Sequence, residues 1–336
     1  MDQVDVIAVV GTCTPERARY AEHLAAATER LPISAARLGM SADPVDEAQA
    51  LAPWSDLPGG CAIEFPAAVP VTELIGRLAH ATSPARLAGI HCVVDAAHLV
   101  EDLARDDYLV RTVPRGEREF RARAMATVTQ IEFATTVVLA NWEQVDTERL
   151  SVVLALVSAL GPSARLRLHP APAAAPDAVT RVAAVQRRPG WIALLNDAFD
   201  PHMTDPRVGA VRFQSLRPFH PARLQRLLDE EIEPGRLGTV VRSAGFCRFA
   251  TRPGVTAQWD HVGSMISFIP TASDDDLRDD EDMLSAGQDI AFIGLDLDRD
   301  GLVRRLEEAC LDDAEFTAGP SAWATYEDPF PAWARV

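Results

Sequence analysis

The chain has 336 residues, of which 48% are hydrophobic and 24% charged, and this length and composition indicate a globular protein of two domains. No apolar run approaches the roughly 18 residues that cross a bilayer, and the acidic N-terminus does not resemble a secretory signal, so no membrane association is expected. The net charge of −17 disfavours nucleic-acid partners, so we expect no direct DNA binding.

The cysteines and the absence of lysine limit the chemistry that this protein can perform. The 5 cysteines are an odd number spaced far apart, which argues against a disulfide framework and for a cytoplasmic location. All 32 basic residues are arginine. Any mechanism that requires a lysine is therefore excluded.

The first half alternates short apolar runs with helical patterns. A strand at Val4–Val10 ends at Gly11, and a helix follows from Pro15 to about Arg30. Further strands are predicted at Cys61–Phe65, Ile90–Val94, Thr136–Leu139 and Arg165–His169, and helices at Val71–His80, Glu117–Phe133 and Glu148–Leu160. This alternation predicts an α/β domain over residues 1–170, with a parallel sheet covered on both faces.

A Pro/Ala stretch at Pro170–Pro176 begins a segment, 171–204, of linker and connecting helices. A smaller α+β domain over 205–336 is predicted from its elements in order. Strands are expected at Val208–Gln214, Thr239–Ala250, Thr256–Ile269 and Ile290–Leu297, and helices at Pro221–Glu230 and Arg299–Cys310. The acidic run Asp274–Asp282 reads as a solvated loop, with a calcium site as the weaker alternative because the EF-hand glycine is missing.

The chain resembles the CobW-like P-loop GTPases. In the second half the resemblance rests on WIALLNDAFDPHMTD (191–205), RPFHPARL (217–224), RSAGF (242–246), GLDLDRDGL (294–302) and DPFPAW (328–333). These segments are similar to the CobW C-terminal domain of actinobacterial members. In the first half, Ile63 and Glu64 resemble a Walker-B-like segment. The resemblance implies a P-loop NTPase-like parallel sheet with flanking helices, followed by a CobW C-terminal-like domain.

The family's nucleotide motifs are altered in this chain. A P-loop reads GxxxxGK[ST], whose lysine reaches the phosphates and whose hydroxyl binds Mg²⁺. Aligned from Gly11, the chain has Glu16 at the second glycine, Arg17 at the lysine and Ala18 at the hydroxyl. Glu16 adds a negative charge next to the phosphates, and Ala18 cannot bind the metal.

Guanine recognition in the family resembles NKxD, and the matching place here reads Asn141-Trp142-Glu143-Gln144. A glutamine cannot accept two hydrogen bonds as the carboxylate does, although Trp142 could stack on a base. The resemblance therefore leaves Gly11, Arg17, Glu64 and Asn141 as a degenerate nucleotide site, with no catalytic residue. GTP and Mg²⁺ are weakly supported, and we expect little or no GTP hydrolysis.

The family's CxCC zinc motif is absent, so neither a metal-binding residue nor bound zinc is expected. Three residues of the second half are candidates for contacting a protein partner, namely Arg217, His220 and Arg242. Two of them also have a structural interpretation. His220 can order the turn between Pro218 and Pro221, and Arg217 can close a local ion pair.

Two functions from different classes follow from the resemblance. The first is a binding or recruiting factor in zinc homeostasis, or in ribosome hibernation during zinc starvation. Its expected partner is a protein, and a ribosome-associated protein is one candidate. The alternative is a GTP-dependent zinc metallochaperone with weak GTPase activity. The altered motifs favour the first.

Overall fold

The computed structural model describes residues 3–113, 116–170, 182, 189–273 and 287–333. The chain divides into two compact units. The first comprises Met1–Gly190 with Pro201–Thr204, and the second comprises Trp191–Asp200 with Asp205–Val336. The division falls inside the segment 171–204 that was expected to connect two domains, and residues 171–181 and 183–188 of that segment lie outside the described residues.

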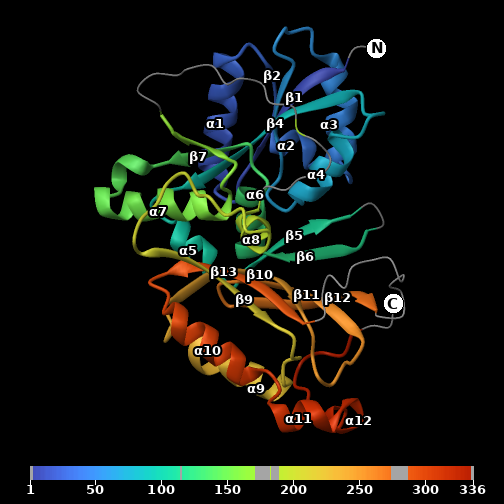
Figure 1. Cartoon of the computed structure of the whole chain (residues 1–336). Coiled ribbons are helices and arrows are strands. Elements are labelled where there is room, and N and C mark those ends of the chain that lie inside the picture. The colour runs from blue at the N-terminus through green and yellow to red at the C-terminus, as the bar shows by residue number, and fades with distance from the viewer. Residues whose placement is uncertain (1–2, 114–115, 171–181, 183–188, 274–286, 334–336) are drawn as a thin grey trace. The chain divides into compact units, whose positions relative to one another are not determined.

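In the first unit, the described residues form a six-stranded parallel sheet of order β2-β3-β1-β4-β7-β8 (Figure 1). The strands are β1 (Val4–Val10), β2 (Leu31–Ile33), β3 (Cys61–Glu64), β4 (Ala85–Asp95), β7 (Thr136–Ala140) and β8 (Arg165–Leu168). The helices are α1 (Thr14–Ala27), α2 (Ala35–Leu38), α3 (Pro44–Leu51), α4 (Val71–Leu78), α5 (Leu99–Leu103), α6 (Arg123–Glu132) and α7 (Thr147–Leu160), and α8 (Gly190–Leu195) follows at the division between the units.

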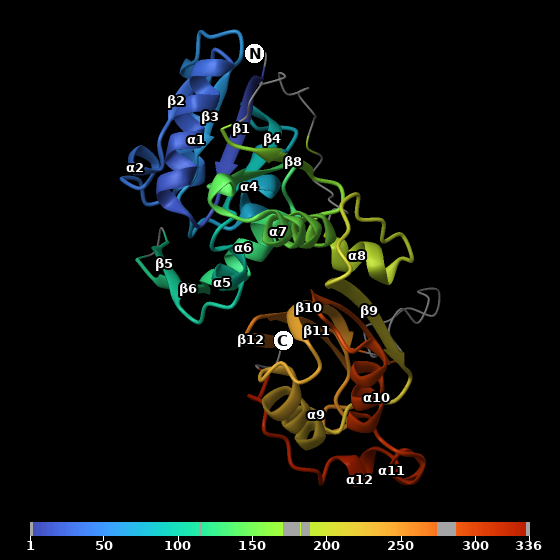
Figure 2. The same cartoon turned by 90° about the vertical axis from the view of Figure 1, so that its left-hand side faces the viewer.

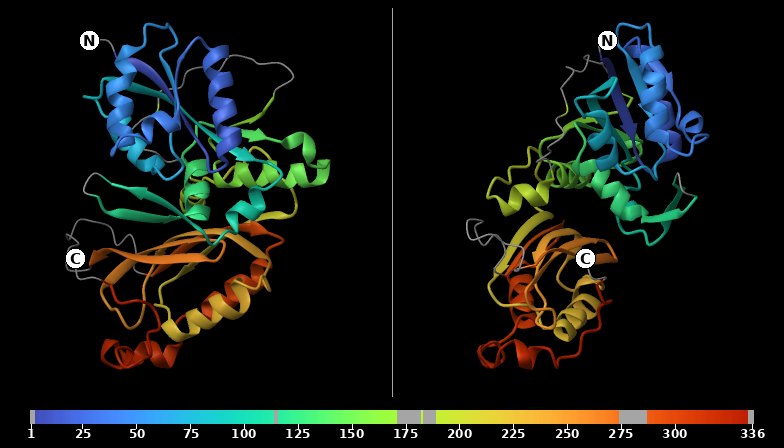
Figure 3. Two further views of the ribbon diagram at one scale, coloured as in Figure 1. Left: turned by 180° about the vertical axis from the view of Figure 1, so that it is seen from behind. Right: turned by 90° about the vertical axis from the view of Figure 1, so that its right-hand side faces the viewer.

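The strands are short and apolar because both faces of the sheet are covered. The last five residues of β1 are buried, and β3 is buried throughout. On one face, Tyr20 and Leu24 of α1 pack with Ile7 and Val9, and Figures 2 and 3 show α1 and α4 on opposite sides of the strands. The predicted parallel sheet with flanking helices is therefore confirmed.

The prediction of a single helix at Glu117–Phe133 is wrong in its first part. Residues Arg118–Ala122 form β6, which pairs with β5 (Tyr108–Thr112) in an antiparallel two-stranded sheet, and α6 begins only at Arg123. Arginine and glutamate favour helices as single residues, but cross-strand pairing with β5 determines the local structure here.

In the second unit, the described residues form a five-stranded antiparallel sheet of order β12-β11-β10-β13-β9. The strands are β9 (Val208–Ser215), β10 (Thr239–Cys247), β11 (Val255–Val262), β12 (Met265–Ser273) and β13 (Gln288–Leu295). The helices are α9 (Pro221–Leu227), continued by a π-helical turn at Leu228–Ile232, α10 (Arg299–Ala309), α11 (Asp313–Ala318) and α12 (Pro320–Trp323). This confirms the smaller α+β domain.

The core of the second unit lies between the sheet and helices α9 and α10. Phe213, Trp259 and Phe292 from three strands pack there with Leu224 and Leu306 from the two helices. The single strand expected at residues 256–269 is instead the hairpin of β11 and β12. Its turn requires Gly263, whose φ of 58° favours glycine, and Val262 pairs with Met265 across it.

Candidate nucleotide-like site

The candidate site lies at the carboxyl ends of the parallel strands, where α/β proteins bind their ligands. Gly11 follows β1, Glu64 ends β3, Asp95 ends β4 and Asn141 follows β7. A side chain at Gly11 is excluded, because its Cβ would lie 2.4 Å from the carbonyl oxygen of Val93 and its φ is 148°. The close approach of β1 to β4 thus explains this glycine without a phosphate.

Arg17, at the position of the P-loop lysine, points into the protein and not toward solvent. Its Nε donates to Oε1 of Glu64 at 2.9 Å, and its Nη1 donates to the carbonyl oxygen of Gly11. The other carboxylate oxygen of Glu64 accepts from the backbone N–H of Ala35 at 3.0 Å. The Arg17 and Glu64 side chains are only 3% and 7% exposed. Gly11, Arg17, Ala35 and Glu64 therefore form one closed unit, which we call the Arg17 cluster.

Asn141 belongs to a second polar group beside this cluster. Its φ is 55°, and its Nδ2 donates to Oδ2 of Asp95 at 3.0 Å and to Oε1 of Glu16 at 3.4 Å. Asp95 also pairs with Nδ1 of the exposed His98 at 3.0 Å, and this hydrogen bond raises the pKa of that imidazole. The structure thus brings Gly11, Arg17 and Glu64 together and places Asn141 next to them, facing two carboxylates.

The residues present do not supply what a magnesium nucleotide requires. The guanidinium of Arg17 is committed to Glu64 and Gly11, and Ala18 offers no oxygen for a metal. Glu16 lies in the first turn of α1, where it accepts from Nη2 of Arg19 at 2.8 Å. Together with Asp95 it sets negative charge where phosphates would bind, and like charges repel.

Zinc binding by cysteine thiolates is also disfavoured in the described residues. Within them, no group of three His, Cys, Asp or Glu side chains is arranged to hold a metal ion. Burial raises the pKa of Cys13 to about 12, and burial also raises the pKa of Cys61. The Sγ of Cys13 donates to the carbonyl oxygen of Val93 at 3.2 Å. These thiols are kept protonated, whereas zinc binds thiolates.

The three partner-binding candidates lie in the second unit and have internal contacts. Arg217 pairs with Asp313, and Arg242 is buried and pairs with Asp260. His220 precedes α9 and stacks on Tyr326 with ring centroids 4.7 Å apart. Burial and the neighbouring Arg223 lower the pKa of His220.

Sequence reasoning missed Asp95 and the contact that links Glu16 to Asn141. The signal for Asp95 was present, because VVDAAHL places an acid directly after a buried strand. Its pairing with Asn141 follows only from the adjacency of β4 and β7, which the chain order alone does not show. Among the described residues, no helix is long and apolar enough to span a membrane.

Comparison with known proteins agrees with this architecture. Residues 208–310 match the model of the cobalamin synthesis protein cobW C-terminal domain. Over 281 residues the chain is 22% identical to "Zinc-regulated GTPase metalloprotein activator 1" of Dictyostelium discoideum, and this match covers 76% of the chain and 59% of that protein. The chain thus spans little more than half the length of this curated relative.

Two solved structures are also similar, at 10% sequence identity. They are the Zn(II)-bound YjiA GTPase of E. coli, with a TM-score of 0.36, and a Zn(II)-bound triple mutant of YjiA GTPase, with a TM-score of 0.37; each alignment covers 93% of this chain and 100% of the other. Scores this low support no conclusion of their own. The cobW C-terminal match lies within the second unit, and it agrees, together with the Dictyostelium relative, with the resemblance to the CobW-like P-loop GTPases.

Proposed function

We propose that this CobW-family protein has an eroded nucleotide site and acts as a cytoplasmic binding or recruiting factor, in zinc homeostasis or in ribosome hibernation during zinc starvation. The observation that carries the proposal is the Arg17 cluster. The arginine at the phosphate-binding position is neutralised by a buried glutamate 47 residues away. A protein that has satisfied this site internally has no need of a nucleotide to order it.

The charges around Arg17 also support an eroded nucleotide site. In a working P-loop, a cation and a metal ion balance the phosphates. Here Arg17 is already balanced by Glu64, and Glu16 and Asp95 add two further carboxylates nearby. Bringing in a triphosphate would require breaking a buried ion pair and placing anions next to anions, and both steps cost free energy.

The test is equilibrium binding of labelled GTP, GDP and ATP, with and without Mg²⁺. We expect no micromolar binding by the wild type and phosphate release near background. A variant with Glu16→Gly, Arg17→Lys and Ala18→Ser restores the P-loop chemistry and should gain Mg²⁺-dependent binding. Arg17→Lys alone serves as the matched control, because it keeps the charge but restores neither the glycine nor the hydroxyl.

The alternative is a GTP-dependent zinc metallochaperone, and the Dictyostelium relative is named as a zinc-regulated GTPase metalloprotein activator. It predicts micromolar GTP binding by the wild type and steady phosphate release that disappears in Arg17→Ala. That result would overturn the eroded-site proposal. A recruiting role predicts instead that a protein partner is captured equally well with or without added nucleotide.

A further inference from the structure

The hairpin of β5 and β6 exposes an apolar face. Tyr108, Val110 and Phe120 are 51%, 41% and 61% exposed. Val110 pairs with Phe120 across the hairpin, and residues two apart on a strand share a face, so these three side chains lie on the same side. The guanidinium of Arg118 lies over the Phe120 ring, 5.4 Å from its centroid. The face therefore combines three large apolar side chains with one cation.

The outer edge of β5 has unsatisfied backbone groups. The N–H of Val113 donates to Glu117, and the N–H of Arg123 donates to Asp107. In an antiparallel pair, hydrogen-bonded positions alternate with non-bonded ones. The N–H and C=O groups of Tyr108, Val110 and Thr112 therefore point away from β6, and no described residue provides a backbone partner for these N–H groups. Such an edge is a template for another strand.

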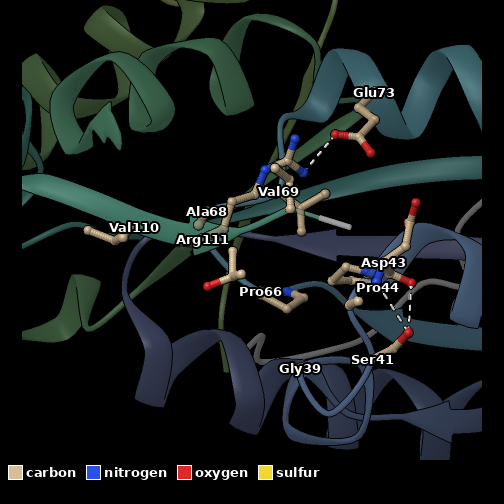
Figure 4. A pocket seen from close by; sticks show the side chains of 13 residues that line it. Gly39, Ser41, Asp43, Pro44, Pro66, Ala68, Val69, Glu73, Val110 and Arg111 are labelled. Carbon is tan, nitrogen blue, oxygen red and sulfur yellow. Dashed lines mark hydrogen bonds and ion pairs between the residues drawn. The ribbon is translucent and has the colours of Figure 1, made fainter. Parts of the chain in front are cut away.

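A cavity of about 320 Å³ runs along this edge. Its wall on one side is Val110–Val113, and the opposite walls come from the loops around Ser41 and Ala68 (Figure 4). An added strand lies about 4.8 Å from its neighbour, so the cavity is where its backbone would run.

Ion pairs hold the walls of this cavity in place. Nη1 of Arg111 donates to Oε2 of Glu73 at 2.8 Å, which fastens β5 to α4. Glu73 also pairs with Arg77, and Arg77 pairs with Asp43 in the opposite wall at 2.8 Å. Because both walls are anchored through α4, the edge and the cavity beside it are preformed, which lowers the entropy cost of binding.

We propose that the β5 edge binds an extended peptide segment of a protein partner as an added strand. The segment has an apolar residue opposite Val110 and a carboxylate two positions away, opposite Thr112. This inference deepens the recruiting role proposed above by naming the docking strand, and it rests on that role for its biological meaning.

The chemistry of the face selects this occupant. An apolar residue next to Val110 would cover Val110 and Phe120, and cross-strand apolar pairs stabilise a sheet. Arg118 is the partner of Thr112 on β6, and its guanidinium, which lies over Phe120 in the structure, would turn across the small Thr112 side chain to meet a carboxylate of the added strand. A second copy of β5 would offer only Tyr108, Val110 and Thr112 on this face, with no carboxylate. The cation therefore favours a different chain.

The probe is a fluorescein-labelled peptide that repeats Thr-Val-Thr-Glu twice, titrated against the full chain and followed by fluorescence anisotropy. Its valines and glutamates lie on one face when it is extended. One control peptide has the same composition with each Val next to each Glu, so that the two fall on opposite faces. A second control has Lys in place of Glu. We expect the first peptide to bind more tightly than either control, and less tightly as salt rises.

Amide hydrogen exchange locates the complex. The amides of Tyr108, Val110 and Thr112 should slow on peptide addition, whereas those of Leu109 and Arg111, already bonded to β6, should change little. Val110→Pro removes an outward N–H while leaving the β5–β6 bonds, and should weaken binding about fivefold. Arg118→Glu should weaken it about threefold at low salt only. Arg226→Glu, an exposed charge reversal on α9, is the matched control and should bind normally.

Two results would overturn the proposal. One is that no peptide of the series slows exchange at Val110 and Thr112. The other is a dimer, seen by light scattering, that Val110→Pro dissolves, which would make a second copy the occupant. Because Val110→Pro could disturb folding, Phe120→Ser gives an independent loss of the apolar face. Nucleotide binding plays no part in these readouts, so failure of the eroded-site proposal would be recognised separately.

Discussion

The Arg17 cluster and the β5–β6 hairpin use their polar and apolar groups in opposite ways. In the cluster, the charged groups and the backbone N–H of Ala35 are paired with one another and nearly excluded from water. In the hairpin, backbone groups point outward and three large apolar side chains face solvent. The Arg17 cluster, where the resemblance predicts a nucleotide site, is therefore buried and internally paired. The face of the β5–β6 hairpin, to which the resemblance assigns no role, is exposed to solvent.

This contrast teaches that polar groups at the carboxyl edge of a parallel sheet can satisfy one another, as Arg17 and Glu64 do here. The buried ion pair links α1 to the carboxyl end of β3. Buried polar groups require partners, and Arg17 and Glu64 provide them for each other. If the nucleotide site is eroded as proposed, a partner has to bind elsewhere on the surface.

The largest expected effect comes from breaking the cluster. Arg17→Ala leaves Glu64 buried without its cation, and such a change should cost about 3–5 kcal/mol of unfolding free energy. Urea denaturation followed by circular dichroism measures it. Replacing both residues together, with Arg17→Met and Glu64→Leu, should cost much less, because no uncompensated charge remains.

A solvent-exposed pair provides the control for that measurement. Arg149 and Glu101 pair at 2.6 Å with side chains 43% and 58% exposed, so Arg149→Ala should cost less than about 1 kcal/mol. Equal losses for Arg17→Ala and Arg149→Ala would show that the cluster is accessible to water, and the closed description of the site would then be wrong.

The next effect is a loss of stability in acid. Burial, together with Arg167 and Arg30, lowers the pKa of His91 from 6.5 to about 3. The unfolded chain binds a proton below its ordinary pKa that the native state does not bind, so native stability falls as pH falls. One such histidine should lower the free energy of unfolding by about 2 kcal/mol between its ordinary pKa and about pH 5.

The variant His91→Asn tests this assignment. The hydroxyl of Tyr20 lies 2.7 Å from Nδ1 of His91, and asparagine keeps a neutral hydrogen-bonding group near that place. Unfolding free energies measured across the pH range should show a smaller acid loss for the variant. His261, whose pKa burial lowers to about 4, should give the same sign in the second unit. An unchanged pH profile for His91→Asn would contradict the assignment.

The sequence predicted the buried strands well, because a sheet covered on both faces demands continuous apolar runs such as VDVIAVV. It missed the hairpin because Arg118–Ala122 is exposed and its Arg and Glu residues are good helix formers. The spacing of the P-loop motif, counted from Gly11, located Arg17 in the sequence. Its partner, Glu64, belongs to a different strand, so their ion pair depends on the order β3-β1 in the sheet, which is a tertiary property.

A smaller effect on stability is expected from a substitution on the exposed face of the β5–β6 hairpin. Phe120→Ser removes a ring that is 61% exposed, so the free energy of unfolding should change by no more than about 0.5 kcal/mol. Trp259, fully buried in the second core, is the matched aromatic, and Trp259→Ala should cost about 3–5 kcal/mol. A large loss for Phe120→Ser would mean that the hairpin face is packed and not available to a partner.

The smallest expected effect is that of metal removal. A zinc site would need thiolates, but burial raises the pKa of Cys13 and of Cys310 to about 12 and raises those of Cys61, Cys92 and Cys247. Cys13, which lies at the start of α1 beside the Arg17 cluster, already donates its hydrogen to Val93. Elemental analysis of tag-free protein should therefore find well below one zinc per chain, and EDTA should leave the Tm unchanged. One zinc per chain that disappears in Cys61→Ser, but persists in Cys13→Ala, would show a metal site that this closed arrangement does not provide.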